Sequence, residues 1–413
     1  MNVLFLSFYF PPRYEISVNR TWNIAKELSK QGCGVTVITV DTTGSIKNQE
    51  EGYYKKEVEQ LGIKVIRTGF FLKEIVPEFF SLENQSIFRY LMGGIVRRIC
   101  RLIRYEIWWP WISAAVKAGK KISRDDVDII LVSAGPYISF QAAYHLSKFF
   151  SVPYVLDYRD LWTNNPIKQT NNKPWIISLE KKYIQHASAV VTVSKSHYES
   201  LYKKYNVQNR YYFVTNGFDS DYLKAIKPKT FTDFSIIFAG SLYEKMDLSP
   251  FLAALKNIYH SHPDLNWQFH YYGPSVELVK KYVQISDIEN RVVIHGFVPR
   301  KEALAAVAGA DVALVLISTE RHATLEERGI ITGKVFEIIG LKTEVMLVAP
   351  ENSDAGGIIK GFGEHFVGDE HEKMKHFLIN RMERTLKRES APPTRYSWPE
   401  LGKQYKALLE ECL

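Results

Sequence analysis

Cysteine is scarce in this sequence of 413 residues, with only Cys33, Cys100 and Cys412 present. The three lie far apart and are odd in number, and their spacing fits neither a metal site nor a dithiol redox motif. Such sparse usage favours a reducing, cytoplasmic setting in which these residues serve as small apolar fillers.

Long hydrophobic runs are also absent. No stretch approaches the ~18 uncharged apolar residues that a membrane-spanning helix needs. The opening run, MNVLFLSFYF, has the length of a strand and shows neither a basic leader nor a small-residue cleavage site. We therefore expect neither a signal peptide nor a membrane span.

Several catalytic motifs are missing as well. Residues 7–21 contain no glycine, which argues against a dinucleotide fingerprint in the first loop. The sequence has no G-x-S-x-G, the mark of one large class of hydrolases. No His, Cys and Asp cluster shows zinc spacing, so we expect no metal site.

The composition that remains is that of an ordinary globular protein, 46% hydrophobic and 24% charged. A chain of this length exceeds one compact core, so two domains are expected. The formal net charge of +8 favours anionic partners. Nucleic acid, anionic lipid and anionic substrates all remain open on composition alone.

The sequence pattern indicates two runs of alternating strands and helices. These runs predict two doubly wound Rossmann-like α/β domains that face each other across a cleft. Between the runs, residues 218–232 lack periodicity and are predicted to be a linker. The expected organisation is an N-terminal domain over 1–217, a C-terminal domain over 233–390, and a terminal helix within 391–413 that packs back toward the N-terminal domain. Strands are expected at 3–10, 35–40, 128–133, 153–156, 189–193 and 211–214, and then at 235–239, 267–272, 292–295, 312–317 and 345–348.

Ligands of open parallel sheets bind beyond the carboxyl ends of the strands, so the loops there hold the candidate site residues. In the first domain, arginines after the first strand could hold an anionic group with paired N–H donors. Tight turns and a polar Asp-Arg-Asp cluster follow later strands, although surface charge, capping and plain turns explain such residues about as well. The candidates are Arg13, Arg20, Gly135, Asp157, Arg159 and Asp160.

In the second domain, Gly240 and Ser241 end a strand before a helix and offer free N–H groups to a phosphate, to which Lys245 could add charge. Thr332 and Gly333 precede a helix with a lysine and a glutamate, which favours a diphosphate and a ribose. The turn at Asn216 is a further candidate. A cap or a plain turn is the alternative reading for each of these positions.

These motifs, in their order and spacing, resemble bacterial retaining glycosyltransferases of family 4, particularly those that build surface or capsular polysaccharides. The segments that carry the resemblance are FYFPP, WWPWISAAVKAGKKI, SAGPYIS, DYRDLW, VTNGFD, FAGSLY, HGFVPRKE, GKVFE and the final YSWPELGKQYKALL. Each motif is weak alone, but together they span nearly the whole chain.

The resemblance implies a GT-B fold, an acceptor bound by the first domain and a UDP- or GDP-linked sugar bound by the second. Transfer would proceed with retention and without a metal or other cofactor. Carried over by position, Glu337 would hold the ribose. Because the family's usual Arg and Lys are missing, neutralisation of the diphosphate would rest on Lys334, with Lys245 as a helper. Asp160 would orient the acceptor or act as a base. Matching backbone or nucleobase contacts fall on Gly240, Ser241, Phe297, Val298, Ile331, Thr332 and Gly333.

The sequence also departs from the family pattern. The first glutamate of the Glu-x7-Glu motif would fall at 329, which is Gly329, and Glu326 or Glu327 could replace it after a loop rearrangement. The usual Arg and Lys after the glycine turn align with Ser241 and Asp247. The expected diphosphate pocket is therefore atypical.

Residues 67–124 combine many aromatic and basic side chains and contain a predicted amphipathic helix over 88–104. Such a segment fits a contact with the inner face of the cytoplasmic membrane and a lipid-linked acceptor. An ordinary helix packed on the first domain is the alternative, and no nucleic-acid motif accompanies the segment.

Two other functional classes remain open: a nucleotide-sugar epimerase or a phosphorylase of the same fold, and a non-catalytic protein that binds sugar or lipid. The main hypothesis is a cytoplasmic, peripheral glycosyltransferase that works on a saccharide or lipid-linked acceptor and binds no nucleic acid.

Overall fold

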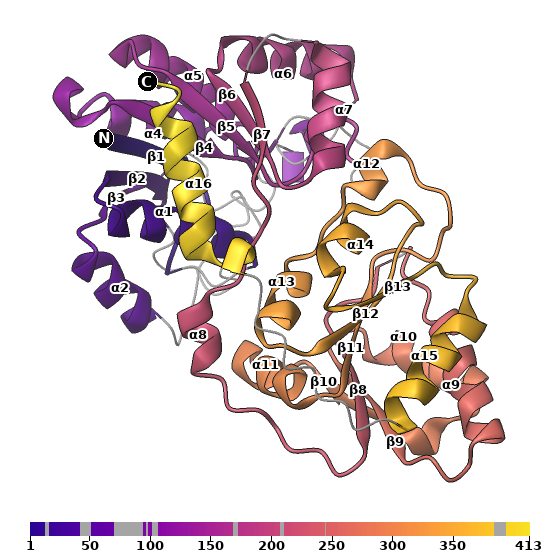
Figure 1. The fold of residues 1–413 in the computed structure, drawn as a ribbon. Coiled ribbons are helices and arrows are strands. Elements are labelled where there is room, and N and C mark those ends of the chain that lie inside the picture. The colour runs from indigo at the N-terminus through magenta and orange to yellow at the C-terminus, as the bar shows by residue number, and fades with distance from the viewer. Residues whose placement is uncertain are drawn as a thin grey trace. The chain divides into compact units, whose positions relative to one another are not determined.

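The chain forms two compact units, each of which is described here by itself (Figure 1). One consists of Met1–Thr215 together with Trp398–Leu413, and the other of Asn216–Ser397. The computed structural model describes residues 1–12, 16–41, 51–69, 94–95, 98–100, 106–167, 172–206, 210–243, 245–383 and 394–413.

The first unit is built on a seven-stranded sheet with the order β3-β2-β1-β4-β5-β6-β7, in which every neighbouring pair is parallel. Most of its strands are short, β-branched and buried, as strands covered on both faces must be. Their bounds are β1 (Asn2–Ser7), β2 (Gly34–Val40), β3 (Lys64–Thr68), β4 (Ile129–Ser133), β5 (Tyr154–Tyr158), β6 (Ala189–Thr192) and β7 (Arg210–Phe213).

Helices cover both faces of this sheet. One apolar cluster joins the sheet to α1 (Ile16–Lys30), α2 (Glu51–Gln60) and α16 (Trp398–Glu410), and α16 lies along α1. The cluster on the other face includes α4 (Trp111–Gly119), α5 (Ser139–Phe150), α6 (Pro174–His186) and α7 (Lys195–Tyr205). The last helix of the chain therefore completes the core of the first unit.

The second unit repeats the design with six parallel strands in the order β10-β9-β8-β11-β12-β13. The strands are β8 (Phe234–Ala239), β9 (Trp267–Tyr272), β10 (Val292–Gly296), β11 (Val312–Leu316), β12 (Glu344–Val348) and β13 (Gly363–Phe366). One face packs on α9 (Ser249–Ser261), α10 (Val276–Ser286) and α15 (His371–Glu383). The other face packs on α8 (Ser220–Lys224), α11 (Arg300–Gly309), α13 (Gly333–Gly340) and α14 (Asp354–Ile359), and α12 (Leu325–Arg328) precedes α13.

The prediction of two doubly wound domains is confirmed, and the predicted strands fall within a few residues of the observed ones. The edge strands β3 and β13 were not predicted. The segment 218–232 differs from the predicted linker, because it contains α8 and buries Phe218, Leu223 and Ile226 in the core of the second unit.

The helix predicted over 88–104 lies mostly outside the described residues; residues 94–95 and 98–100 are described, and they are helical. In the part of the chain that the structure describes, no helix combines the length and the apolar character needed to cross a bilayer.

Candidate functional site

The turn after β8 is shaped by two glycines. Gly240 has φ +144°, a conformation that side chains rarely adopt, and a Cβ on Gly273 would lie 2.2 Å from the carbonyl oxygen of Gly240. The Gly240 N–H donates to the carbonyl of Tyr272 at 2.7 Å, and the Tyr271 hydroxyl donates to the carbonyl of Gly240 at 3.0 Å. The turns after β8 and β9 are thus held against each other, with the half-buried Ser241 beside them.

Lys334 occupies the space that Gly240 leaves open. A Cβ on Gly240 would lie 1.6 Å from the Lys334 Nζ, and the ammonium group sits 5.5 Å from the centre of the Phe238 ring. Burial lowers the pKa of Lys334, while Glu337 acts in the opposite direction. Within the described residues Nζ has neither a hydrogen bond nor an ion pair. A largely desolvated ammonium without a carboxylate partner is suited to bind an anion.

The first turn of α13 adds backbone donors to this position. The Thr332 side chain caps the helix and accepts from the Lys334 N–H at 3.4 Å. A side chain at Gly333 would meet no atom within 4 Å, so a ligand can approach the backbone there. The N-terminus of a helix favours negative charge, which strengthens the case for a phosphate. Ile331, just before the cap, is half-buried.

Glu337 lies one turn further along α13 and is paired. Its Oε1 accepts from the Arg300 Nη2 at 2.5 Å, and the Arg300 guanidinium packs over the Tyr222 ring at 4.7 Å. Both charged side chains are partly exposed, and Glu337 Oε2 has no hydrogen bond to any described residue. Sequence reasoning missed Arg300, since no spacing linked it to a helix that begins more than thirty residues later.

Lys245 is engaged elsewhere, against the expectation that it helps to neutralise a diphosphate. Its Nζ lies 3.2 Å from Glu320 and 2.5 Å from Glu327, and these carboxylates raise its pKa. Glu327 also forms a capping box with Thr324, which counts against its replacing the carboxylate missing at Gly329.

The remaining donor candidates lie in three places. Phe297 is 81% exposed just beyond β10, whereas Val298 is half-buried and packs against the core. Asn216 is half-buried and is the first residue of the second unit. Phe297 is therefore the candidate most accessible to a nucleobase.

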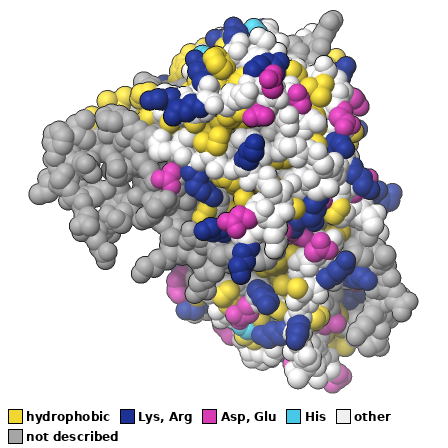
Figure 2. Space-filling view, turned by 90° about the vertical axis from the view of Figure 1, so that its left-hand side faces the viewer, with side chains coloured by type: hydrophobic (Ala, Val, Ile, Leu, Met, Phe, Trp, Pro, Cys, Tyr) yellow, Lys and Arg dark blue, Asp and Glu magenta, His cyan; other side chains and the backbone are white. Residues whose placement is uncertain are grey.

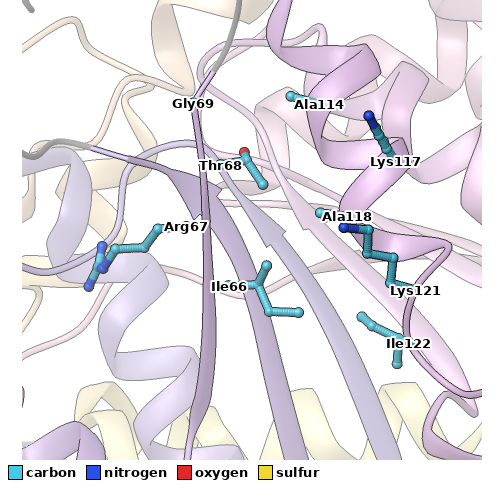
Figure 3. A pocket seen from close by; sticks show the side chains of 9 residues that line it. All are labelled: Ile66, Arg67, Thr68, Gly69, Ala114, Lys117, Ala118, Lys121 and Ile122. Carbon is cyan, nitrogen blue, oxygen red and sulfur yellow. The ribbon is translucent and has the colours of Figure 1, made fainter.

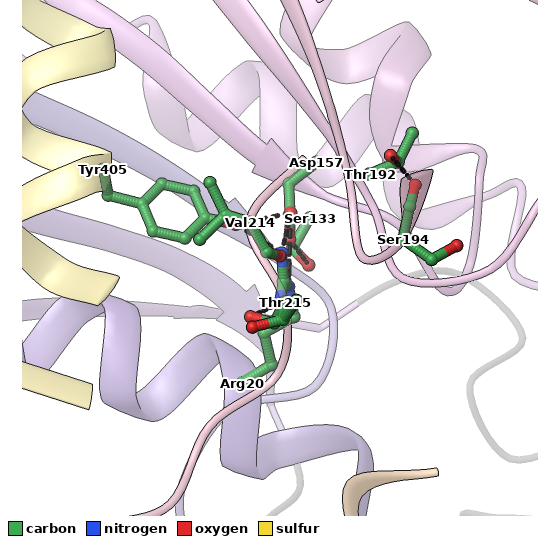
Figure 4. Close-up of polar contacts among 8 residues, drawn as sticks. All are labelled: Arg20, Ser133, Asp157, Thr192, Ser194, Val214, Thr215 and Tyr405. Atoms are coloured by element: carbon green, nitrogen blue, oxygen red, sulfur yellow. Dashed lines mark hydrogen bonds and ion pairs between the residues drawn. The ribbon is translucent and has the colours of Figure 1, made fainter. Parts of the chain in front are cut away.

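In the first unit, Arg20 and Asp157 belong to a buried network (Figure 4). Arg20 is 2% exposed and Asp157 0%, and the guanidinium donates to Asp157, to the hydroxyl of Tyr405 and to the carbonyls of Val214 and Thr215. Burial acts to raise the pKa of Asp157, but Arg20, Tyr405 and Ser133 together lower it. This corrects the expectation that Arg20 and Asp157 contact an acceptor, because both are enclosed and satisfied by protein groups.

Gly135 and Arg159, by contrast, do come together at the ends of β4 and β5. Gly135 has φ +95°, and a Cβ there would lie 2.3 Å from the Arg159 Nη2. The Tyr137 hydroxyl donates to the carbonyl of Asp160 at 3.0 Å, while the exposed Asp160 carboxylate has no hydrogen bond to a described residue. Arg13 lies outside the described residues.

Two buried or half-buried acids that support this region were not predicted. Glu106 accepts from the N–H groups of Tyr137 and Ile138 at 3.0 and 2.7 Å and so caps the start of α5. Glu180 is fully buried, accepts from the hydroxyls of Thr163 and Tyr205, and has a pKa raised by desolvation. The one feature of the sequence that could have indicated Glu106 and Glu180 is a carboxylate on an otherwise apolar segment.

The described residues contain no group of three or more His, Cys, Asp or Glu side chains placed to hold a metal ion. Metal independence itself stays a prediction.

Known proteins resemble this chain in sequence or in fold. Residues 17–222 match the family model described as Glycosyltransferase Family 4. No curated protein sequence matches the chain.

Solved structures with the same architecture show the GT-B fold. A sucrose-phosphate synthase from Thermosynechococcus elongatus has 13% identity and a TM-score of 0.63, with 99% of this chain and 98% of that chain covered. Anabaena HepE in complex with UDP has 14% identity and a TM-score of 0.62, with both chains covered fully. The lipopolysaccharide outer core galactosyltransferase WaaB has 11% identity and a TM-score of 0.58, again over 100% of each chain.

Proposed function

We propose that this chain, whose residues 17–222 form a glycosyltransferase family 4 domain within a GT-B fold, is a retaining, metal-independent glycosyltransferase. It would move a sugar from a nucleotide donor to a saccharide or lipid-linked acceptor in the synthesis of a bacterial surface polysaccharide. The observation that carries the proposal is the ammonium of the half-buried Lys334, which lies against Gly240 without a carboxylate partner among the described residues.

The donor would bind in the second unit, with its diphosphate between Lys334, the N–H groups at the start of α13 and the turn at Gly240. The free oxygen of Glu337 is placed one helical turn away, where it can accept from a ribose hydroxyl. Phe297, exposed after β10, can lie beside the base. The nucleotide would be UDP or GDP, and the complex of HepE with UDP supports UDP.

The chemistry would take place on one face of the donor. As the bond from the anomeric carbon to the diphosphate oxygen breaks, the acceptor hydroxyl bonds to the same face and its proton passes to the leaving diphosphate. Lys334 stabilises the charge that grows on the diphosphate, and the two units orient the reactants. Arg159 and Asp160 are the first-unit residues placed to orient the acceptor.

The setting proposed for the enzyme is the inner face of the cytoplasmic membrane, where a lipid-linked acceptor would be available. The basic composition and the aromatic and basic segment 67–124 support this setting. The similarity to WaaB, a lipopolysaccharide outer core galactosyltransferase, is in keeping with it.

The test is incubation of the full chain with a panel of UDP- and GDP-linked sugars, with and without a lipid-linked saccharide. Nucleotide release that requires the acceptor is expected. A change of the sugar without nucleotide release would identify an epimerase, and binding of a nucleotide sugar without any turnover would identify a non-catalytic binding protein. Failure to bind every nucleotide sugar would overturn the proposal.

A further inference from the structure

A hollow of about 420 Å³ lies between the edge strand β3 and helix α4 of the first unit (Figure 3). Ile66 and Thr68 form the strand side of the hollow, and Ala114, Lys117, Ala118 and Lys121 form the side that belongs to α4 and its C-terminal extension. Arg67 also lines the hollow, but its guanidinium donates to the carbonyl of Pro11, and its side chain is drawn pointing away from the two lysines.

The hollow follows from the spacing of these residues. Ala114, Lys117 and Ala118 recur at intervals of three and one residues on one side of α4, and Lys121 follows in the turn just after the helix. The two alanines are too small to reach β3, and the lysines stand at the rim. The wall opposite is fixed, because the Trp111 indole N–H of α4 donates to the Thr68 hydroxyl at 2.9 Å.

The lysines of this hollow have no counter-charge in the described part of the chain. Neither Lys117 nor Lys121 forms an ion pair or a side-chain hydrogen bond to a described residue. Some helical lysines elsewhere in the described chain are paired, such as Lys280 with Glu277 and Lys403 with Glu400. What sets Lys117 and Lys121 apart from other unpaired lysines is that both line the same hollow, where they can attract an anionic ligand.

We propose that this hollow binds the phosphate of an anionic membrane lipid head group. Trp109, just before α4, is 46% exposed, and Phe149, at the end of α5, is 51% exposed with the Lys120 ammonium 5.1 Å from its ring centre. An exposed aromatic ring beside a lysine, as at Phe149, is typical of a membrane interface, and it favours a lipid over a soluble phosphate. The inference rests on the proposed membrane setting and adds to it a site distinct from Arg159 and Asp160.

The charge distribution on one face of the molecule argues for a local site. On the face drawn in Figure 2, Lys and Arg side chains are spread out with apolar side chains between them, and they form no single continuous basic patch. A general attraction to anionic membranes would use all of these charges about equally. A site in the hollow predicts instead that Lys117 and Lys121 dominate.

The experiment is sedimentation of the full chain with phosphatidylcholine vesicles that contain or lack phosphatidylglycerol. The variant Lys117→Gln/Lys121→Gln is expected to reduce binding to the anionic vesicles about 25-fold, at about fivefold for each lysine. The matched control, Lys181→Gln/Lys203→Gln, removes the same charge from exposed positions on α6 and α7 and should change binding less than about twofold.

A second variant, Ala118→Leu, fills the hollow and keeps both lysines. This variant should weaken vesicle binding nearly as much as the double lysine variant does. If the attraction were a general electrostatic one, vesicle binding by Ala118→Leu would be unchanged. Equal losses in the two lysine double variants, or full binding by Ala118→Leu, would overturn the proposal. Inorganic phosphate at millimolar concentration is then added as a competitor. If it abolishes the part of vesicle binding that depends on Lys117 and Lys121, the hollow binds soluble phosphate and the lipid assignment is overturned.

Nucleotide-sugar binding is measured on the same preparations. If UDP binds and vesicle binding does not depend on Lys117 and Lys121, the lipid site is overturned and the glycosyltransferase proposal stands. Lysine-dependent vesicle binding without any nucleotide-sugar binding would overturn the glycosyltransferase proposal alone.

Discussion

Arg20 and Asp157 are joined by a buried ion pair, with Nη2 of the arginine 2.8 Å from Oδ1 of the aspartate. The pair lies between α1 and the end of β5, and Tyr405 of α16 bonds to both partners, at 2.6 Å to Arg20 and 2.7 Å to Asp157. The guanidinium also holds the carbonyls of Val214 and Thr215, the last residues of the first unit before the chain enters the second. One side chain therefore ties the terminal helix to the point where the chain leaves the unit.

Arg20→Met is expected to lower the free energy of unfolding by about 3–5 kcal/mol, because it leaves the Asp157 carboxylate buried without its partner. Guanidinium titration followed by circular dichroism measures the loss. Arg321→Met, which removes an exposed pair with Asp369, should cost less than about 1 kcal/mol. The double variant Arg20→Met/Asp157→Leu should lose less than the two single variants together, and an additive loss would contradict the assignment of a coupled buried pair.

Lys334→Ala should lower kcat/KM for the donor by about a hundredfold or more, since it removes the cation proposed to stabilise the leaving diphosphate. Gly240→Ala should act in the same direction, because its Cβ would displace the ammonium group. Lys245→Ala is the matched control, because the charge of Lys245 is compensated by Glu320 and Glu327. The kcat/KM of this variant should stay within a few fold of that of the unaltered chain. Comparable losses in Lys334→Ala and Lys245→Ala would contradict the assignment.

Much of this fold could be predicted from hydrophobic runs and turn residues alone. Buried parallel strands such as those at 129–133 and 345–348 are continuous apolar runs, and they were found. Strand β3, KVIRT, lies at the sheet edge and has only two adjacent apolar residues among three polar ones, so it gives no such run. The helix α8 was missed because its five residues are too few to show a period.

The candidate site was less predictable, because the partners of charged residues are set by tertiary packing. Lys334 and Lys245 are both lysines after a turn, yet one lies against a glycine and the other between two carboxylates. Arg20 follows the first strand, and this position in the sequence suggested a ligand contact. The sequence position does not show whether the side chain is exposed to a ligand or buried in the protein. Only the placement of Tyr405, 385 residues later, decides the matter.

Glu337→Gln should raise KM for a UDP-sugar about tenfold or more, because it weakens a charged hydrogen bond to the ribose. The variant should also lose discrimination between the ribose donor and its 2′-deoxy analogue. Glu302→Gln makes the same change at an exposed position on α11 and should alter neither value. Retained discrimination in Glu337→Gln would show that another group contacts the 2′-hydroxyl.

His270 should make the chain less stable in acid. Burial, with His295 and Lys229 nearby, lowers the pKa of His270 to about 4, whereas an unfolded histidine titrates near 6.5. Asp233 acts in the opposite direction, but not enough to offset them. Between these two pH values the unfolded chain binds more protons, so stability falls as the pH is lowered through this window, by about 2–3 kcal/mol in all.

His270→Gln should remove this part of the pH dependence, and chemical denaturation at pH 7 and pH 5 measures it. The control is His371→Gln, at an exposed histidine on α15. An unchanged pH dependence in His270→Gln would mean that other groups cause the acid sensitivity.

Asp160→Asn tests the acceptor side. The carboxylate is exposed, and its backbone carbonyl is held by the Tyr137 hydroxyl, so the substitution leaves the loop after β5 in place. If Asp160 orients the acceptor hydroxyl or accepts its proton, transfer should fall about a hundredfold or more while the Kd for UDP stays unchanged.

A melting curve should show no loss of stability in Asp160→Asn, and Asp126→Asn, at an exposed aspartate before β4, should transfer at the rate of the unaltered chain. A parallel loss of UDP affinity would move the effect from the acceptor to the donor. Unchanged transfer would leave Arg159, brought against Gly135 at the same edge of the sheet, as the remaining acceptor candidate from this loop.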